Sequence, residues 1–245
     1  MNIGLASVAV VTRNTQRNVA AMVAEMERHS GDCELLVFGE SALQGFECLT
    51  WNYEIDCHMA VTQDAPPILQ MRQAAQRLGM GVSFGYLERS KEKIYSSQIV
   101  IDQHGEVVHN FHRVSKGWKA YWRTDQHYCE GEAFETFYYG GKKIAIALCG
   151  DLWTEGRPEE MKALNPDVVL WPVWCDFPCQ EWNQKVKYEY AQQAARCGER
   201  VLYVNPFCMD TWVRDAATGG AAYFQGGTVM AELPAGKPGV LIVSI

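Results

Sequence analysis

The sequence lacks the features that mark proteins of membranes and of nucleic acids. No apolar run approaches the roughly 20 residues that span a bilayer, and the N-terminus MNIGLASVAVVTRN has no basic flank or small-residue cleavage site. Basic residues are outnumbered, with 22 Lys and Arg against 29 Asp and Glu and a formal charge of −7. We therefore expect a cytoplasmic protein that binds neither membranes nor nucleic acid.

A disulfide framework is also missing. The 9 cysteines are odd in number and scattered along the chain, which is typical of reduced thiols in a cytoplasm. Cys175-x-x-x-Cys179 could provide half of a zinc site, but no second Cys/His pair with ligand spacing lies nearby. We expect no metal or organic cofactor.

No linker, repeat, charge block or low-complexity stretch divides the chain. With 48% apolar and 11% aromatic residues, the composition is that of a folded globular protein able to bury a full core. A length of 245 residues would allow two small domains or one large one. Without a boundary signal, we interpret residues 1–245 as a single domain.

Hydrophobic periodicity predicts strands that alternate with helices. A first helix should begin after Asn14, present Val19, Met22 and Met26 on one face, and end near Ser30. Further helices are predicted at 67–78 and at about 181–197. Several strands are apolar on both faces, so we expect a layered α/β sandwich. The three consecutive strands between residues 82 and 111 are expected to be antiparallel. The predicted strands are 3–11, 34–38, 82–87, 97–101, 107–111, 144–149, 168–171, 201–205, 221–224, 228–233 and 240–245.

Three kinds of reactive side chain follow buried strands, where α/β folds place their sites. Glu40 follows LLVFG, Cys149 ends IAIAL, and Lys116 and Lys119 follow VVHNF. A carboxylate can activate a thiol as nucleophile, and an ammonium can stabilise the oxyanion of acyl chemistry. Taken singly, each has a plainer interpretation, since a lone cysteine is usually a core residue and a lone Glu or Lys is usually solvated.

The segments around these residues resemble the nitrilase, or carbon-nitrogen hydrolase, superfamily. The resemblance is carried by LLVFGESALQGF (35–46), FHRVSKGWK (111–119), IAIALCGDLW (144–153) and PDVVLWPVW (166–174), in this order, and extends over the whole chain. It implies a four-layer α-β-β-α sandwich that forms a homodimer through its helical layer. It also implies hydrolysis of a non-peptide C–N bond in a small-molecule amide-type substrate, without a cofactor.

The resemblance assigns roles to two motifs. The family's glutamate corresponds to Glu40, with Gly45-Phe46 behind it, and the nucleophile turn corresponds to Cys149-Gly150-Asp151. Glu40 would take the thiol proton, and the backbone of Gly150 and Asp151 would help to hold the oxyanion. Glu40 would then return the proton to the departing amine and activate water against the thioester. We expect the Asp151 side chain to stabilise its own turn.

The lysine of the triad is where this sequence departs from the family. The usual Tyr-Arg-Lys-x-His-Leu pattern overlays 111–116 and places Arg113 where the lysine is expected. Lys116 and Lys119 are the other contenders. We favour Lys119, because Gly117-Trp118 looks like a turn that could aim the next side chain inward, with Lys116 second. For the family's second glutamate, Asp125 is better placed than the neighbouring Glu130.

The sequence indicates the substrate only in part. Trp174, just past the strand 168–171, is the expected pocket wall, which favours a small or partly apolar molecule. Amides are the commonest outcome in the family, with carbamoyl amines or nitriles as alternatives. A catalytically inactive or binding relative is the rival from another class. A papain-like pair is disfavoured, because the histidines precede Cys149 and the nucleophile does not open a helix.

Overall fold

The apolar strands form two six-stranded mixed sheets. The computed structural model describes residues 1–245. The first sheet runs in the order β14 (Gly239–Ser244), β1 (Asn2–Ser7), β3 (Leu35–Phe38), β4 (Gly81–Ser90), β5 (Lys93–Ile101) and β6 (Val107–His112). The second runs β13 (Thr228–Leu233), β12 (Ala221–Gln225), β10 (Arg200–Val204), β9 (Val168–Pro172), β8 (Lys142–Ile146) and β7 (Thr136–Tyr139). A small parallel pair joins β2 (Ala9–Val10) to β11 (Phe207–Cys208).

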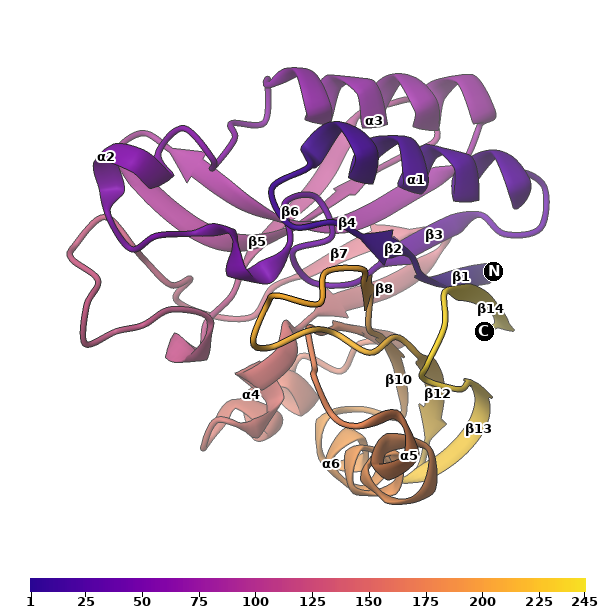
Figure 1. Cartoon of the computed structure of the whole chain (residues 1–245). Coiled ribbons are helices and arrows are strands. Elements are labelled where there is room, and N and C mark those ends of the chain that lie inside the picture. Colours follow the sequence, from indigo (N-terminus) through magenta and orange to yellow (C-terminus); the bar gives the residue numbers. More distant parts are fainter.

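Helices cover the outer face of each sheet (Figure 1). On the first sheet lie α1 (Thr15–Arg28) and α3 (Pro66–Leu78), and on the second lie α4 (Arg157–Ala163), α5 (Cys179–Glu181) and α6 (Lys187–Cys197). The short α2 (Tyr53–Asp56) lies in the connection between β3 and α3. The four-layer α-β-β-α sandwich expected from the sequence is confirmed. No helix is long and apolar enough to cross a bilayer.

The two-residue period of a strand explains how one segment serves two cores. In β3, Leu35 and Val37 belong to the core between the sheets, whereas Leu36 and Phe38 pack with the residues of α1 and α3. Successive strand side chains point to opposite faces, so a strand with helices on one side and a sheet on the other must be apolar throughout. That is the composition of LLVF.

Most predicted elements are present, and the differences have local causes. Asn14 caps α1 by accepting from the Arg17 N–H at 3.1 Å, and Gly79 ends α3 in the left-handed region at φ +61°. The predicted strand 3–11 breaks before Ala9, where β2 leaves to pair with β11. The predicted helix 181–197 is interrupted by a π-helical turn over Trp182–Val186. That 1–245 is a single domain stays a prediction.

A buried carboxylate on β4 ties together the first sheet. Glu88 accepts hydrogen bonds from Ser97 Oγ and Asn110 Nδ2, and His112 Nε2 also lies against it, each at 2.8 Å. Burial alone would raise the pKa of Glu88, but the hydrogen bonds from His112, Asn110 and Ser97 outweigh it and lower the pKa to about 2. The carboxylate therefore stabilises the fold only while it is ionised.

We expect Glu88→Gln to remove part of the acid sensitivity of folding. Because the folded pKa lies below the ordinary 4.5, this carboxyl contributes its full stability above pH 4.5 and loses it as the pH falls toward 2. Between these limits the wild type should lose about 3 kcal/mol more unfolding free energy than the variant. Urea unfolding at several pH values measures the difference, with the exposed Glu27→Gln as control. Parallel pH curves for wild type and Glu88→Gln would contradict the assignment.

Candidate active site

Loops from both sheets meet where several strands end. Glu40 follows β3 and Cys149 follows β8, both of which lie in parallel pairs, while Arg113 directly follows the edge strand β6. The Glu40 backbone N–H donates to the Val173 carbonyl at 3.2 Å, so a hydrogen bond joins the loop after β3 to the end of β9. The structure brings Glu40, Arg113 and Cys149 together at this junction.

Glu40 is held on one of its two carboxylate oxygens. Oε1 accepts from Ser96 Oγ and from Arg113 Nη1, each at 2.8 Å, while Oε2 is buried and has no hydrogen-bond partner in the protein. Because Oε1 carries both hydrogen bonds, Oε2 is the oxygen that is free to accept a proton. Gly85 allows β4 to approach the backbone of Glu40 and Ser41, because a Cβ on this glycine would lie only 2.4 Å from the Ser41 nitrogen.

Arg113 connects Glu40 to the turn of the candidate nucleophile. Its Nε donates to Ser115 Oγ at 2.9 Å, and a Cβ on Gly150 would lie 2.9 Å from Nη2. Burial opposes the positive charge, but Glu40, Cys149 and Asp151 outweigh it and raise the pKa of Arg113 above its ordinary value. The guanidinium is a fixed cation that contacts both halves of the site.

Cys149 lies in a strained and partly exposed turn. Its φ of +42° is in the left-handed region, which costs a non-glycine residue free energy and is often found at functional sites. The Trp171 indole donates to the Cys149 carbonyl at 2.8 Å, and the Cys149 thiol donates to the Trp174 carbonyl at 3.7 Å. A hydrogen bond with the Cys175 thiol lowers the pKa of Cys149 most; burial opposes this, and Arg113 lowers it further. Cys149 is thus a partly exposed thiol whose surroundings lower its pKa.

Asp151 holds the Arg113 loop against the nucleophile turn. Its carboxylate accepts from the backbone N–H groups of Leu148 at 2.9 Å, Ser115 at 2.8 Å and Val114 at 3.2 Å. Burial raises the pKa of Asp151 to about 6, although Arg113 and these N–H groups act to lower it. The Asp151 backbone N–H donates to the Leu148 carbonyl at 2.9 Å, so it does not fit the oxyanion role predicted for it. Gly150 is left as the backbone candidate.

Neither predicted lysine lies at Glu40. Lys116 is exposed, in the 3-10 turn Lys116–Trp118. Lys119 Nζ donates to the Tyr128 carbonyl and forms an ion pair with Glu130 at 2.8 Å. Trp118 is buried in a small apolar core that includes Tyr128, which turns Lys119 toward Tyr128 instead of toward Glu40. The cation at Glu40 is Arg113, the residue that the family pattern overlays on the lysine.

Asp125 and Trp174, which were also predicted to belong to the site, differ in their location. Asp125 is 56% exposed and accepts from the backbone and ring of His127, whose hydrogen bonds lower the pKa of Asp125. It lies in a surface loop and is not brought to Glu40. Trp174 is buried, stacks on Phe46 with ring centroids 6.1 Å apart, and donates from Nε1 to the Asp215 carbonyl at 2.6 Å. It forms a rigid wall beside Cys149.

Sequence reasoning missed several residues of the site. Ser96 bonds Glu40, Trp171 fixes the Cys149 carbonyl, and Cys175 lowers the pKa of Cys149. Ser96 and Trp171 carried a weak signal, because a polar side chain within a doubly buried strand needs a partner. Cys175 carried none, since one cysteine among 9 is not distinctive.

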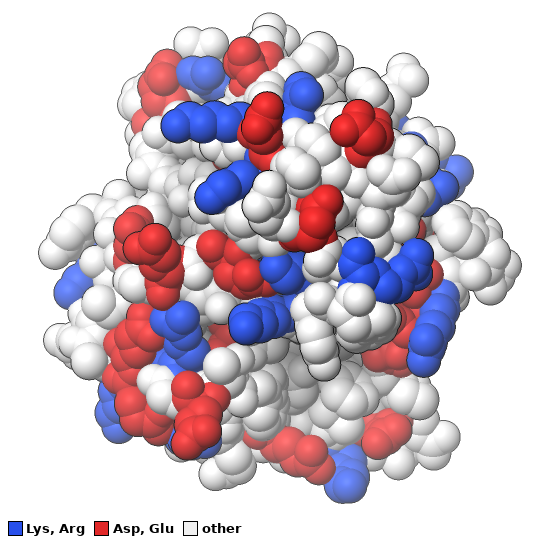
Figure 2. Space-filling model, turned by 90° about the vertical axis from the view of Figure 1, so that its left-hand side faces the viewer, with Lys and Arg blue, Asp and Glu red and all other residues white.

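A cavity of about 410 Å³ adjoins the site. Its walls include the aromatic side chains Phe46, Trp51, Trp118 and Trp122, together with Lys119 and Asp215. Gly117 is also in the wall, and a Cβ on this glycine would lie 3.2 Å from Arg113 Nη2. Gly117, one of the residues that line the cavity, therefore lies beside the Arg113 guanidinium. Figure 2 shows the molecule from the side of the α2 region, with acidic and basic side chains interspersed over the surface.

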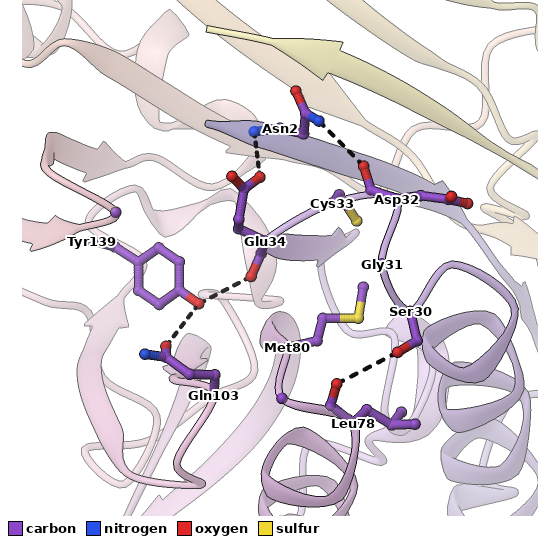
Figure 3. A pocket seen from close by; sticks show the side chains of 12 residues that line it. Asn2, Ser30, Gly31, Asp32, Cys33, Glu34, Leu78, Met80, Gln103 and Tyr139 are labelled. Atoms are coloured by element: carbon purple, nitrogen blue, oxygen red, sulfur yellow. Dashed lines mark hydrogen bonds between the residues drawn. The ribbon is translucent and has the colours of Figure 1, made fainter.

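A cavity of about 580 Å³ lies beside the amino ends of β1 and β3, away from this site (Figure 3). Its polar groups bond one another: the Asn2 N–H donates to the Glu34 carboxylate, and the Tyr139 hydroxyl donates to the Glu34 carbonyl at 3.0 Å. Burial raises the pKa of its one cysteine, Cys33, to about 11. This cavity holds no activated nucleophile.

The fold and the site define a class of protein, and comparison with known proteins gives the same class. Residues 3–245 match the family model described as carbon-nitrogen hydrolase, so the chain belongs to the carbon-nitrogen hydrolase family.

The solved structures that it resembles share the fold. A nitrilase-superfamily amidase from Nesterenkonia AN1 superposes with a TM-score of 0.82 at 18% identity, covering 100% of this chain and 90% of that one. A glutamine-dependent NAD+ synthetase from Acinetobacter baumannii gives 0.75 at 20% identity, covering 98% of this chain and 44% of that one.

Curated relatives match over shorter stretches. An (R)-stereoselective amidase from Pseudomonas is 22% identical over 170 residues, which is 69% of this chain and 59% of the relative. An arylacetonitrilase from Hypocrea virens is 27% identical over 88 residues, which is 33% of this chain and 27% of the relative. The match therefore spans less than two thirds of either relative's own length.

We expect Arg113→Met to be strongly destabilising, because it leaves Glu40 buried without its cation. Breaking a buried pair from one side costs about 3–5 kcal/mol, whereas removing both charges costs less. The double variant Glu40→Gln/Arg113→Met should therefore be more stable than Arg113→Met alone. Urea unfolding of both single variants and the double variant measures the interaction. Additive losses would show that the two side chains are not energetically linked.

Proposed function

We propose that this protein hydrolyses a non-peptide C–N bond of a small amide or carbamoyl compound through a thioester on Cys149. The observation that carries the proposal is the buried Glu40–Arg113 pair, with one free carboxylate oxygen, beside a thiol of lowered pKa. A base, a nucleophile and a fixed cation are the groups that acyl transfer requires.

In the first step, Glu40 Oε2 takes the proton of the Cys149 thiol and the thiolate attacks the carbonyl carbon. The carbonyl π electrons move to oxygen, and Arg113 Nη2 and the Gly150 N–H stabilise the resulting oxyanion. Support comes from the hydrogen bonds of the guanidinium, since Nε is bonded to Ser115 and Nη1 to Glu40, which leaves Nη2 toward Gly150.

In the second step, the tetrahedral adduct collapses and the C–N bond breaks. Glu40 returns its proton to the nitrogen, which leaves as ammonia or an amine. Glu40 then removes a proton from water, the hydroxide attacks the thioester, and the C–S bond breaks to release the acid. The proton returns to sulfur, so Glu40 and Cys149 end the cycle as they began.

The cavity beside the site is proposed to receive the rest of the substrate. Its aromatic walls favour a partly apolar group, which would reach the site past Gly117 and the Phe46–Trp174 stack. Nitrile hydrolysis by the same residues is the second candidate, favoured by the match to an arylacetonitrilase. A homodimer formed through the helical layer and a cytoplasmic location are further proposals, which rest on the family resemblance and the sequence.

Intact-mass measurement with short amides, carbamoyl amines and nitriles tests the function. Wild type should turn over at least one class and release ammonia. An acyl adduct should form on Cys149 of wild type only: Glu40→Gln should form none, because its amide can neither take the thiol proton nor protonate the departing nitrogen, and Cys149→Ala has no nucleophile. We expect turnover by Glu40→Gln to fall at least about 100-fold, the usual range for a lost general base.

Each outcome separates the candidates. An acid released from amides supports the amidase, and turnover restricted to nitriles supports the second candidate. If no compound modifies the protein, and iodoacetamide labels Cys149 no faster than the buried Cys197, the chain is an inactive or binding relative on this scaffold.

A further inference from the structure

The loop between β11 and β12 lies in the wall of the cavity beside the site, where it contributes Arg214 and Asp215. Val213 of the same loop is buried in the core that also contains Trp174, the rigid wall beside Cys149. The loop therefore packs against the aromatic surface that a substrate meets on its way to the nucleophile. The catalytic steps proposed above give this loop no role.

One carboxylate holds this loop with both of its oxygens. Glu47 Oε2 accepts from the Arg214 backbone N–H at 3.0 Å, and Oε1 accepts from the Asp215 backbone N–H at 3.1 Å. Glu47 lies in the 3-10 turn Phe46–Cys48, far from the loop in the sequence. Hydrogen bonds to an ionised acceptor are stronger than those between neutral groups, so two of them fix the loop firmly against this turn.

The same loop holds the indole ring of Trp174. The Asp215 carbonyl accepts from Trp174 Nε1 at 2.6 Å. The Trp174 ring stacks on Phe46, with ring centroids 6.1 Å apart and an interplanar angle of 21°. Because Phe46 directly precedes Glu47, these contacts form a closed ring that runs from the carboxylate to the loop, to the indole, to Phe46 and back along the chain. The indole cannot tilt without breaking one of them.

The backbone of Trp174 is fixed separately from its ring. The backbone N–H of Val173, the preceding residue, donates to the Val204 carbonyl of β10 at 2.9 Å. The Trp174 carbonyl in turn accepts from the Cys149 thiol at 3.7 Å. Loss of Glu47 would therefore release the indole and leave in place the backbone that contacts the nucleophile.

We propose that Glu47 is a positioning residue that sets the substrate class: by fixing the β11–β12 loop, it holds the Phe46–Trp174 stack in an orientation that accepts a planar apolar group carried by the substrate. The inference rests on the proposed hydrolysis at Cys149. An aromatic face binds another ring in preferred geometries, and a face that is already fixed loses little freedom on binding. A short aliphatic substrate gains nothing from such a face. The expected substrates are therefore compounds that carry an aryl group.

Amide hydrogen exchange, read at Arg214 and Asp215 by mass spectrometry with residue resolution, tests whether Glu47 holds the loop. In Glu47→Ala both amides should exchange at least about tenfold faster than in wild type, because each loses a hydrogen bond to a charged acceptor. Glu47→Gln keeps one acceptor oxygen and should protect one amide only. The matched control is Glu54→Gln, which removes an exposed carboxylate from α2 and should exchange at these amides as wild type does.

Turnover of two compounds that differ only by a ring tests the substrate class. The pair is 3-phenylpropanamide and propanamide, or the corresponding ureas or nitriles if wild type hydrolyses that class instead. Wild type should show a kcat/KM at least about tenfold higher for the compound with the ring, which is the effect of burying one apolar group. Glu47→Ala should raise the KM for this compound at least about fivefold with kcat almost unchanged, and should leave the smaller compound within about twofold of wild type.

The outcomes distinguish failure of the inference from failure of the function. If wild type hydrolyses both compounds equally well, or if Glu47→Ala exchanges as wild type does, the inference is wrong and the hydrolase stands. A raised KM without faster exchange would also overturn it, because Glu47 would then contact the substrate itself. So would an equal rise in KM for both compounds, which would indicate a general loosening of the site. If wild type hydrolyses no compound of any class, the proposed function itself fails.

Discussion

The ion pair between Glu40 and Arg113 is the interaction on which the rest of the site depends. Both side chains are almost wholly buried, with exposed fractions of 0% and 3%, so neither charge is tolerable without the other. The pair fixes one oxygen of Glu40 and frees the second, and it carries a positive charge to the Cys149 turn. Asp151 shares the same cation at 3.9 Å, so two carboxyl groups compete for one guanidinium. Burial raises the pKa of Asp151 to about 6, and Arg113, which acts to lower it, offsets only part of that effect.

The two-sheet sandwich holds the Glu40–Arg113 pair rigidly in place. Parallel strands end at a common edge, and close backbone contacts join the edges of the two sheets. A Cβ on Gly39 would lie 2.3 Å from Pro206 Cδ, and one on Gly85 would lie 2.6 Å from the Glu40 Cα. These contacts leave no room for side chains, so they fix the loop after β3 against β4 and against the segment after β10. Precise placement of a base is more easily achieved on such a scaffold than on a free loop.

Sequence reasoning reached the parts of the molecule that depend on local pattern. The layered fold was predicted because several strands are apolar on both faces. Glu40 and Cys149 were identified because each comes directly after such a strand. The sequence analysis favoured Lys119 as the cation, whereas the structure places Arg113 at Glu40. The reason is that the path of the chain after β6 is set by contacts with residues distant in sequence. Asp151 binds the backbone of Val114 and Ser115 and so directs Arg113 inward, while burial of Trp118 carries Lys119 away. The family pattern over 111–116 pointed to Arg113, but these distant contacts cannot be seen in the residues 111–119 alone. The strand β7 was missed for a related reason, since its exposed Tyr138 interrupts the apolar run.

An arginine in the place of a lysine restricts the chemistry of the site. A lysine ammonium can lose a proton when it is buried, whereas a guanidinium cannot within the range in which proteins are folded. Arg113 can therefore orient Glu40 and stabilise charge, but it cannot relay protons. Every proton transfer in the proposed cycle must then pass through Glu40, and only its Oε2 is free to do so. A single carboxylate oxygen must accept from sulfur, donate to nitrogen, accept again from water and return the proton to sulfur, so the three reacting atoms must occupy one small region in turn. The fixed guanidinium, bonded to Glu40 Oε1 and Ser115, is what keeps that oxygen in place through all four transfers.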